Sequence, residues 1–444
     1  MPESIPSPLS FPTRAGVPLA VAFDGGRLTS DGGLPWLADA DTALGLSDTL
    51  AACLPRRQRA SRHAVAAVLR QRLFQIACGY ADQNDATTLR HDPLFKLACG
   101  RLPESDPPLA SQATLSRFEN RIDRRSLERL ASALVELYLR QRQQHGTPRQ
   151  VVLDVDGTAD PAHGKQEGVR YHAYYRQHMY HPLLVFDGDT GQLITAVLRP
   201  GTAHGSRLVV LVLRRLVRRL RAAWPGVQVE LRADSGFAVP RLYQWCEANR
   251  VHYTIGLIPN ARLEAIAAPL LAEAQAKSAA AGGEKVRLAG ATWYQAETWP
   301  TQRRVVYKAE ALAAGPNTRF VVTDHAEAPL AVYDAYVDRG QSENYIKDFK
   351  NALAADRLSD HRFAANQFRL LLHAAAYVLF HTLRGWLAGT DLAVAQFDTI
   401  RLRLVKIAGR VRQLATGIRL HLASSHPSEP LWRHLAASPR TLTA

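Results

Sequence analysis

The sequence has few cysteines and no long apolar run. Its 4 cysteines form no Cys-x-x-Cys pair, which argues against a disulfide scaffold and predicts buried free thiols in a reducing compartment. No apolar stretch reaches the roughly 18 residues that a membrane-spanning helix needs, and no charged leader precedes an apolar segment. We therefore expect a soluble, cytoplasmic protein with no membrane partner.

Acidic residues are too few to balance the basic ones. The 444 residues include 40 Asp and Glu against 55 Lys and Arg, for a formal charge of +15. Such an excess favours a polyanionic partner, most commonly nucleic acid, although a GC-rich genome rich in Arg codons produces the same bias. The length exceeds one ordinary core and predicts two or three structural units.

The first third of the chain is predicted to be helical. Residues 30–145 contain apolar runs at helical spacing over Ala64–Cys78 and Leu127–Leu139. Between them, Ser111–Arg121 suits a recognition helix whose N-terminus lies against DNA. A plain capped helix explains this segment equally simply.

From residue 151 the pattern changes to an α/β one. Helices are predicted at Gly205–Ala223 and Val239–Asn249. The predicted strands are Val151–Asp156, His181–Gly188, Gln192–Pro200, Val227–Asp234 and His252–Leu257. Three meander strands followed by right-handed crossovers give a five-stranded mixed sheet, with the fourth strand parallel beside the first.

Asp156 and Asp234 each close one of these strands at its carboxyl end. Neighbouring strands lie about 5 Å apart, so the two carboxylates would repel unless a cation lay between them. Oxygen ligands of this kind favour Mg²⁺ or Mn²⁺. The alternative is that each Asp is an ordinary turn or cap residue, and Asp154, two residues before Asp156, is a competing ligand.

A second cluster lies in Val332–Lys350. Tyr336, Arg339, Glu343 and Lys350 follow one another at steps of three, four and seven, which places them on one stripe of a helix. Two cations, a carboxylate and a ring suit phosphate, a hard metal ion and a base or sugar. The alternative is a solvated face, with packing by the opposite residues Tyr345, Phe349 and Leu353.

Two further segments complete the predicted organisation. A helix over Ala261–Lys277 and strands over 293–299, 303–310 and 318–324 predict an inserted, partly β subdomain, and alternation over 398–413 predicts a strand with a basic face. The expected divisions are 1–149 (helical, a candidate for binding DNA ends), 150–258 (core), 259–330 (insertion), 331–385 (core, with the Glu343 helix) and 386–444 (basic).

The chain resembles the DDE transposases of bacterial insertion sequences, in the group marked by a Tyr-x2-Arg-x3-Glu-x6-Lys signature. Tyr336, Arg339, Glu343 and Lys350 match every step of that signature. The Asp-bearing strands read LDVDGT and LRADSGF, and the subgroup's N-terminal stretches are matched by TSDGG, FQIACGYADQNDATTLRHD and SQATLSRFENR.

The resemblance implies an RNase H-like fold with an insertion before the Glu helix. It implies that Asp156, Asp234 and Glu343 are catalytic and bind two Mg²⁺ ions, with Mn²⁺ as a substitute. Asp156 is preferred to Asp154 because it precedes Gly-Thr.

The resemblance also implies partners and an activity. Tyr336 and the two cations, Arg339 and Lys350, would hold the DNA backbone. The implied activity is cutting double-stranded DNA at the element's terminal repeats and joining the 3′-hydroxyl to target DNA, by a homodimer at the bacterial nucleoid. The alternatives are a nuclease or resolvase of the same fold without strand transfer, and a DNA-binding derivative without catalysis.

Overall fold

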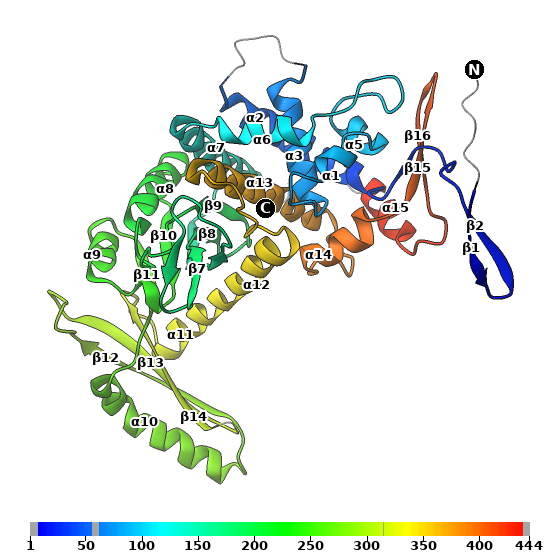
Figure 1. Ribbon diagram of the computed structural model, residues 1–444. Helices are drawn as coiled ribbons and strands as arrows, with labels where there is room; N and C mark the ends of the chain where they lie inside the picture. The colour runs from blue at the N-terminus through cyan, green and yellow to red at the C-terminus, as the bar shows by residue number, and fades with distance from the viewer. Residues whose placement is uncertain (1–7, 56–61, 314, 438–444) are drawn as a thin grey trace. The chain divides into compact units, whose positions relative to one another are not determined.

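A computed structural model describes residues 8–55, 62–313 and 315–437, and Figure 1 shows its helices and strands. The chain forms two compact units. One combines the segment up to Phe118 with the segment from Leu383 onward, and the other is built from Glu119–Thr382. None of the helices in the described ranges is both long and apolar enough to cross a bilayer.

The second unit is built on a mixed sheet with the order β12-β13-β14-β11-β10-β4-β8-β9. The five predicted strands are all present as neighbours, and β10 is parallel to β4 and to β11, while β8 is antiparallel to β4. Their bounds are β4 Gln150–Gly157, β8 Leu183–Asp187, β9 Leu193–Val197, β10 Gln228–Ala233 and β11 His252–Leu257. The expected placement of the fourth strand beside the first is therefore observed.

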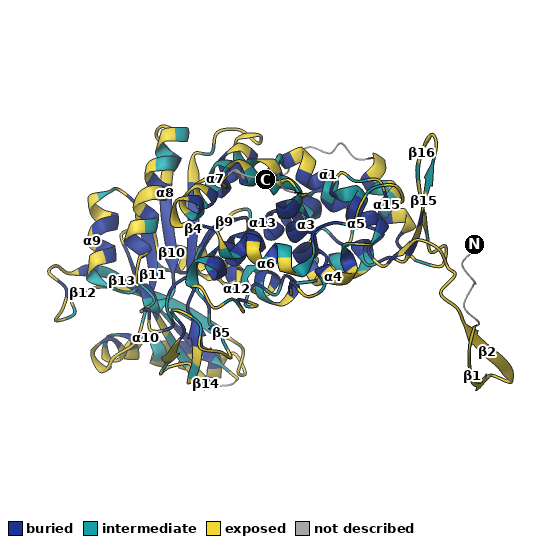
Figure 2. Ribbon diagram, turned by 45° about the horizontal axis from the view of Figure 1, so that its top comes forward, coloured by how far each residue is buried: buried dark blue, intermediate teal, exposed yellow. Residues whose placement is uncertain are grey.

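The central strands of this sheet are buried on both faces, although only one face of β10 is apolar: Val229, Leu231 and Ala233 alternate with the buried polar residues Glu230 and Arg232. Five consecutive residues of β10 are buried, as expected for a parallel strand between two layers of helices. The helices of this unit include α7 Arg124–Gln143, α8 Val209–Ala223, α9 Pro240–Ala248 and α13 Phe363–Trp386. On α8, Leu213, Leu216 and Leu220 are buried and three arginines are exposed on the other side, as Figure 2 shows for the helix as a whole.

The insertion extends the main sheet. It contains α10 Ala261–Ala280, β12 Val286–Tyr294, β13 Arg303–Leu312 and β14 Gly315–Thr323. Strand β14 pairs antiparallel with β11, which makes eight strands in all. The strand predicted over 293–299 is displaced: β12 covers Val286–Tyr294, so only Trp293 and Tyr294 of the predicted range pair with β13. Trp299 is buried instead, and Trp293 is 65% exposed at the end of β12.

The first unit is mainly helical, as predicted for residues 30–145. Its longer elements are α1 Leu34–Leu44, α2 Leu46–Ala52, α3 Val65–Ala77, α5 Pro93–Ala98, α6 Gln112–Asn120 and α15 Glu429–Ala437. The single basic strand predicted over 398–413 is wrong. Ile400 and Leu404 are both buried in a helical stretch, and the strand β15 begins only at Gly409.

Segments from opposite ends of the chain meet in this unit. Strand β15, Gly409–Leu414, pairs with β3, Leu28–Thr29, and with β16, Gly417–Leu422. Lys406 Nζ lies 2.7 Å from Oδ1 of the buried Asp31. The amide of Gly33 donates to the carbonyl of Val405 at 3.0 Å. These contacts give the TSDGG stretch a structural role.

Candidate functional site

The predicted Val332–Lys350 helix is a continuous helical path whose pitch changes twice. It consists of α11 Pro329–Val337, a 3₁₀ turn Asp338–Gly340, α12 Gln341–Lys347 and a π turn Asp348–Ala352. Such turns inside helices are frequent at functional sites. The changes in pitch mean that residue spacing alone does not determine the direction of each side chain on the stripe.

Asp156 lies at the end of β4 and is only 7% exposed. Its Oδ1 accepts a hydrogen bond from the Gly157 amide at 2.8 Å, and its Oδ2 accepts one from the Arg339 guanidinium at 2.8 Å. The pKa of Asp156 is raised to about 6, because burial, together with the nearby carboxylates of Asp234 and Glu343, outweighs the lowering effect of Arg339. Asp156 therefore lies close enough to both predicted partners to be affected by their charge.

Asp234 follows β10 directly. Val155 and Ala233 are register partners, so Asp156 and Asp234 each come one residue beyond a paired position on adjacent parallel strands. The Oδ1 of Asp234 accepts from the Gly236 amide at 2.8 Å. The turn-capping role considered for this Asp is thus real, and it leaves the other carboxylate oxygen for a further partner.

Glu343 is exposed on α12, and it has no hydrogen bond or ion pair with any described residue. Within the ranges that the structure describes, no three His, Cys, Asp or Glu side chains are close enough to hold one metal ion. The carboxylates of Asp234 and Glu343 are near enough to affect the pKa of Asp156, but the three do not converge on one point as metal ligands would. Their hard oxygen donors and mutual repulsion nevertheless fit a divalent cation.

Asp154 has a partner of its own. It is fully buried, and the Nε and Nη2 of Arg232 donate to its two carboxylate oxygens at 2.7 and 2.8 Å. Arg232 also donates to the carbonyl of Ala335 at 2.8 Å, which connects β10 to α11. Sequence reasoning missed Arg232, although Arg232 and Asp154 occupy partnered positions on the two predicted parallel strands.

The remaining stripe residues contact the edge of the sheet. The Tyr336 hydroxyl donates to the carbonyl of Ala233 at 3.3 Å, next to Asp234. The Lys350 ammonium donates to the carbonyl of Ala159. The structure therefore places Tyr336 and Arg339 against the strand ends that carry the two Asp residues, and Lys350 against the loop that follows β4.

Tyr175 is a nearby residue that sequence reasoning missed. Its pKa is raised by partial burial and by the charges of Asp234 and Asp156. Its ring lies 6.0 Å from the ring of His181, and His181 in turn contacts the carbonyl of Ala203 through Nδ1 at 2.8 Å. The loop residue Tyr175 thus belongs to the surroundings of the carboxylates, and the spacing of the motif gave no signal for it.

The comparison with protein families agrees with the sequence resemblance. The chain matches the protein family described as "Transposase DDE domain group 1" over residues 11–443. A cryo-EM structure of the piggyBac transposase synaptic complex with hairpin DNA is similar with 12% sequence identity and a TM-score of 0.41. That alignment covers 85% of this chain and 80% of the other. No curated protein matches the sequence.

Proposed function

Because the chain belongs to the transposase DDE domain group 1 family, whose members cleave nucleic acid, we propose that it is the DNA transposase of an insertion sequence. The observation that carries this proposal is the position of Asp156. Its carboxylate is buried at a strand end, and its pKa responds both to Asp234 on the adjacent strand and to Glu343 on α12. Three carboxylates from separate elements suit a phosphoryl-transfer centre.

We assign an RNase H-like fold to the core of the second unit. The antiparallel strands β8 and β9 beside β4, followed by parallel β10 and β11, support this assignment. So does the insertion of β12 to β14 between β11 and the helical path that carries Glu343.

DDE transposases generally use divalent metal ions. In this chain Asp156, Asp234 and Glu343 are the residues that would hold two Mg²⁺ ions, or Mn²⁺ in their place. Bound ions would supply an activated hydroxyl and stabilise the leaving oxygen of the scissile phosphodiester. Asp154 is a poor ligand by comparison, because Arg232 already occupies both of its oxygens.

The stripe would position DNA beside these carboxylates. Arg339 and Lys350 are cations and cannot ligate a metal ion, but guanidinium and ammonium groups bind phosphate oxygens well. On binding, the DNA backbone would take the Arg339 guanidinium from Asp156 and leave that carboxylate for the metal. Tyr336, held beside Asp234, would contact the base or sugar next to the scissile bond.

The proposed substrates are the two terminal repeats of the element and a target duplex. Water would cut the element ends, and the freed 3′-hydroxyls would then attack the target in the same site. Because an element has two ends, a homodimer on DNA is the assembly that would hold both.

The test is incubation of the protein with labelled DNA spanning the element ends, in the presence of Mg²⁺. Cleavage at the repeat ends followed by joining to a second duplex supports the proposal. Asp234→Asn and Glu343→Gln should abolish cleavage and retain DNA binding, whereas Glu264→Gln, an exposed glutamate on α10, should cut normally. Cleavage without joining would indicate a nuclease, and binding without cleavage an inactive derivative.

A further inference from the structure

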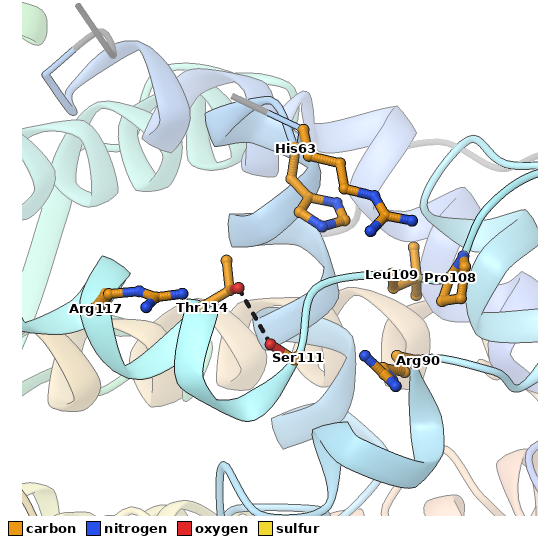
Figure 3. A pocket seen from close by; sticks show the side chains of 8 residues that line it. His63, Arg90, Pro108, Leu109, Ser111, Thr114 and Arg117 are labelled. Carbon is orange, nitrogen blue, oxygen red and sulfur yellow. Dashed lines mark hydrogen bonds between the residues drawn. The ribbon is translucent and has the colours of Figure 1, made fainter. Parts of the chain in front are cut away.

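A basic site separate from the carboxylates lies in the first unit, where three arginines line a cavity of ≈ 250 Å³. In Figure 3, the side chains of His63, Arg90 and Arg117 approach the cavity from different sides. Among the described residues that line it there is no carboxylate. The lining residues are Arg62, His63, Arg90, Pro108, Leu109, Ser111, Thr114 and Arg117.

The charges of these arginines are not neutralised by any carboxylate in the part of the chain that the structure describes. Neither Arg62, Arg90 nor Arg117 forms an ion pair with any residue that the structure describes. Arg90 donates from Nε to the His91 ring at 3.0 Å, and this neutral contact leaves the rest of its guanidinium available. Like charges gathered around one cavity repel each other, and a bound anion removes that repulsion.

Buried contacts fix the walls of the cavity. The Gln71 side chain, 1% exposed, exchanges two hydrogen bonds of 2.9 Å with the backbone of Ala110. The amide of Leu109 donates to the carbonyl of Arg90 at 3.0 Å. Arg101 contacts His63 Nδ1 at 2.9 Å and donates to the carbonyls of the adjoining proline loop. The site is therefore formed before any ligand arrives.

The lining chemistry suits phosphate. Guanidinium groups bind phosphate oxygens through paired N–H donors, and the hydroxyls of Ser111 and Thr114, which are 3.2 Å apart, add further donors. The cavity is smaller than the roughly 300–1,000 Å³ of typical small-molecule sites. Its described lining residues include no Phe, Tyr or Trp ring on which a base could stack. These features favour backbone phosphates over a whole nucleotide.

We propose that this cavity binds the phosphodiester backbone of double-stranded DNA, outside the carboxylate site. The proposal rests on the proposed function in taking DNA as the polyanion. It gives Ser111–Arg121 a binding role through its first turns, with Arg117 and Thr114 contacting phosphate and reading no base. Binding here would be independent of sequence.

The salt dependence of DNA binding tests the proposal. Each phosphate contact contributes about 0.9 to the slope of log affinity against log salt. Arg90→Ala/Arg117→Ala in the full chain should therefore lower that slope by about 1.8, measured by anisotropy of a labelled duplex from about 50 to 200 mM salt. The control Arg124→Ala/Arg433→Ala removes the same charge at exposed sites that already pair with glutamates, and should leave the slope unchanged.

Two additional measurements separate charge from fold and DNA from other phosphates. Arg90→Lys/Arg117→Lys keeps both charges and should recover most of the parental slope; a slope as low as that of the Ala variant would mean structural damage and overturn the proposal. An unchanged slope in the Ala variant would also overturn it. Inorganic pyrophosphate serves as the second probe. If the Ala variant lost pyrophosphate binding but bound DNA as the parent does, the cavity would be a site for small phosphates, and this result would also overturn the proposal. End cleavage by the parent protein with an unchanged slope in the Ala variant would reject this inference alone, whereas a reduced slope without any cleavage would reject the transposase activity alone.

Discussion

The guanidinium of Arg339 lies 2.8 Å from Oδ2 of Asp156. A proposed phosphate-binding residue is therefore paired with a proposed metal ligand. The guanidinium of Arg339 is the counter-charge that offsets the negative charge of the buried Asp156 carboxylate. The consequence is that the DNA backbone, which would bind Arg339, and the metal ion, which would bind Asp156, each compete with the same ion pair.

Arg339→Gln should strengthen metal binding while weakening DNA binding. Removing a cation in contact with Asp156 should raise Mn²⁺ affinity about tenfold at pH 8, equivalent to about 1.4 kcal/mol. Loss of a charge-assisted phosphate contact should weaken end binding or cutting by roughly ten- to a hundredfold, or about 1.5–3 kcal/mol. Calorimetric Mn²⁺ titration and an end-cleavage assay measure the two effects. Lys350→Gln is the control, since Lys350 contacts a carbonyl, and its Mn²⁺ affinity should match the parent's.

Asp156→Asn should stabilise the metal-free protein at neutral pH. The pKa of Asp156 is about 6 in the folded state against 3.8 for an unperturbed Asp, so the folded state binds more protons between these values. Stability from this group is then highest at low pH and falls as pH rises from about 4 to 6, by about 3 kcal/mol in all. Denaturant unfolding should show the variant more stable than the parent at pH 7, with the difference vanishing near pH 4. A variant destabilised equally at both pH values would contradict this prediction.

Asp154→Asn should instead destabilise the protein, because Asp154 accepts from Arg232 with both carboxylate oxygens whereas Asp156 accepts from Arg339 with one. It leaves Arg232, whose side chain is 6% exposed, as a buried cation without its bidentate partner. Breaking a buried pair in this way costs about 3–5 kcal/mol. Thermal unfolding should show a large loss for Asp154→Asn, and the double variant Asp154→Leu/Arg232→Met should recover much of it. If Asp154→Asn left stability unchanged but removed metal binding, Asp154 would be the ligand instead of Asp156.

Gly33→Ala should destabilise the first unit selectively. A Cβ at this position would lie 1.9 Å from the carbonyl oxygen of Leu404 and 2.5 Å from the Cα of Val405, so backbone must move. Overpacking of this kind costs about 1–3 kcal/mol. Limited proteolysis should cut residues 28–118 faster in the variant, with 119–382 protected as in the parent. Gly146→Ala is the comparison variant: an added Cβ there would meet nothing within 4 Å, so its only cost is backbone strain at a φ of +96°.

Local pattern was enough to predict most of the core. The apolar runs at β4, β8, β9, β10 and β11 identified those strands, and the handedness of crossovers placed β10 beside β4. The attachment of β14 to β11 could not be predicted, because strand pairing depends on a partner far away in the sequence. The run from Ile400 to Leu404 satisfies both the helical and the strand period, and the 67% exposure of Leu402 between these two buried residues identifies the helix.

The site was predictable in its residue types and less so in its contacts. Tyr336, Arg339, Glu343 and Lys350 could be grouped by spacing, yet the 3₁₀ and π turns that aim them are not encoded in that spacing. The pairing of Arg339 with Asp156 arises from the approach of the helical path to the sheet edge. The Arg232–Asp154 pair follows from strand register, which was within reach of the sequence once β4 and β10 were assigned as neighbours.

The division of the first unit between the two ends of the chain affects how it can be made. A ribosome adds roughly 5–20 residues per second, so Asp31 and Gly33 wait for tens of seconds before Lys406 and Val405 exist to pair with them. Glu119–Thr382, by contrast, is contiguous and can fold while the rest is still being synthesised. A chain released early would carry the carboxylates of the second unit but an unfinished first unit. The arginine-lined cavity therefore belongs to a unit that can become stable only after the C-terminal segment has been translated.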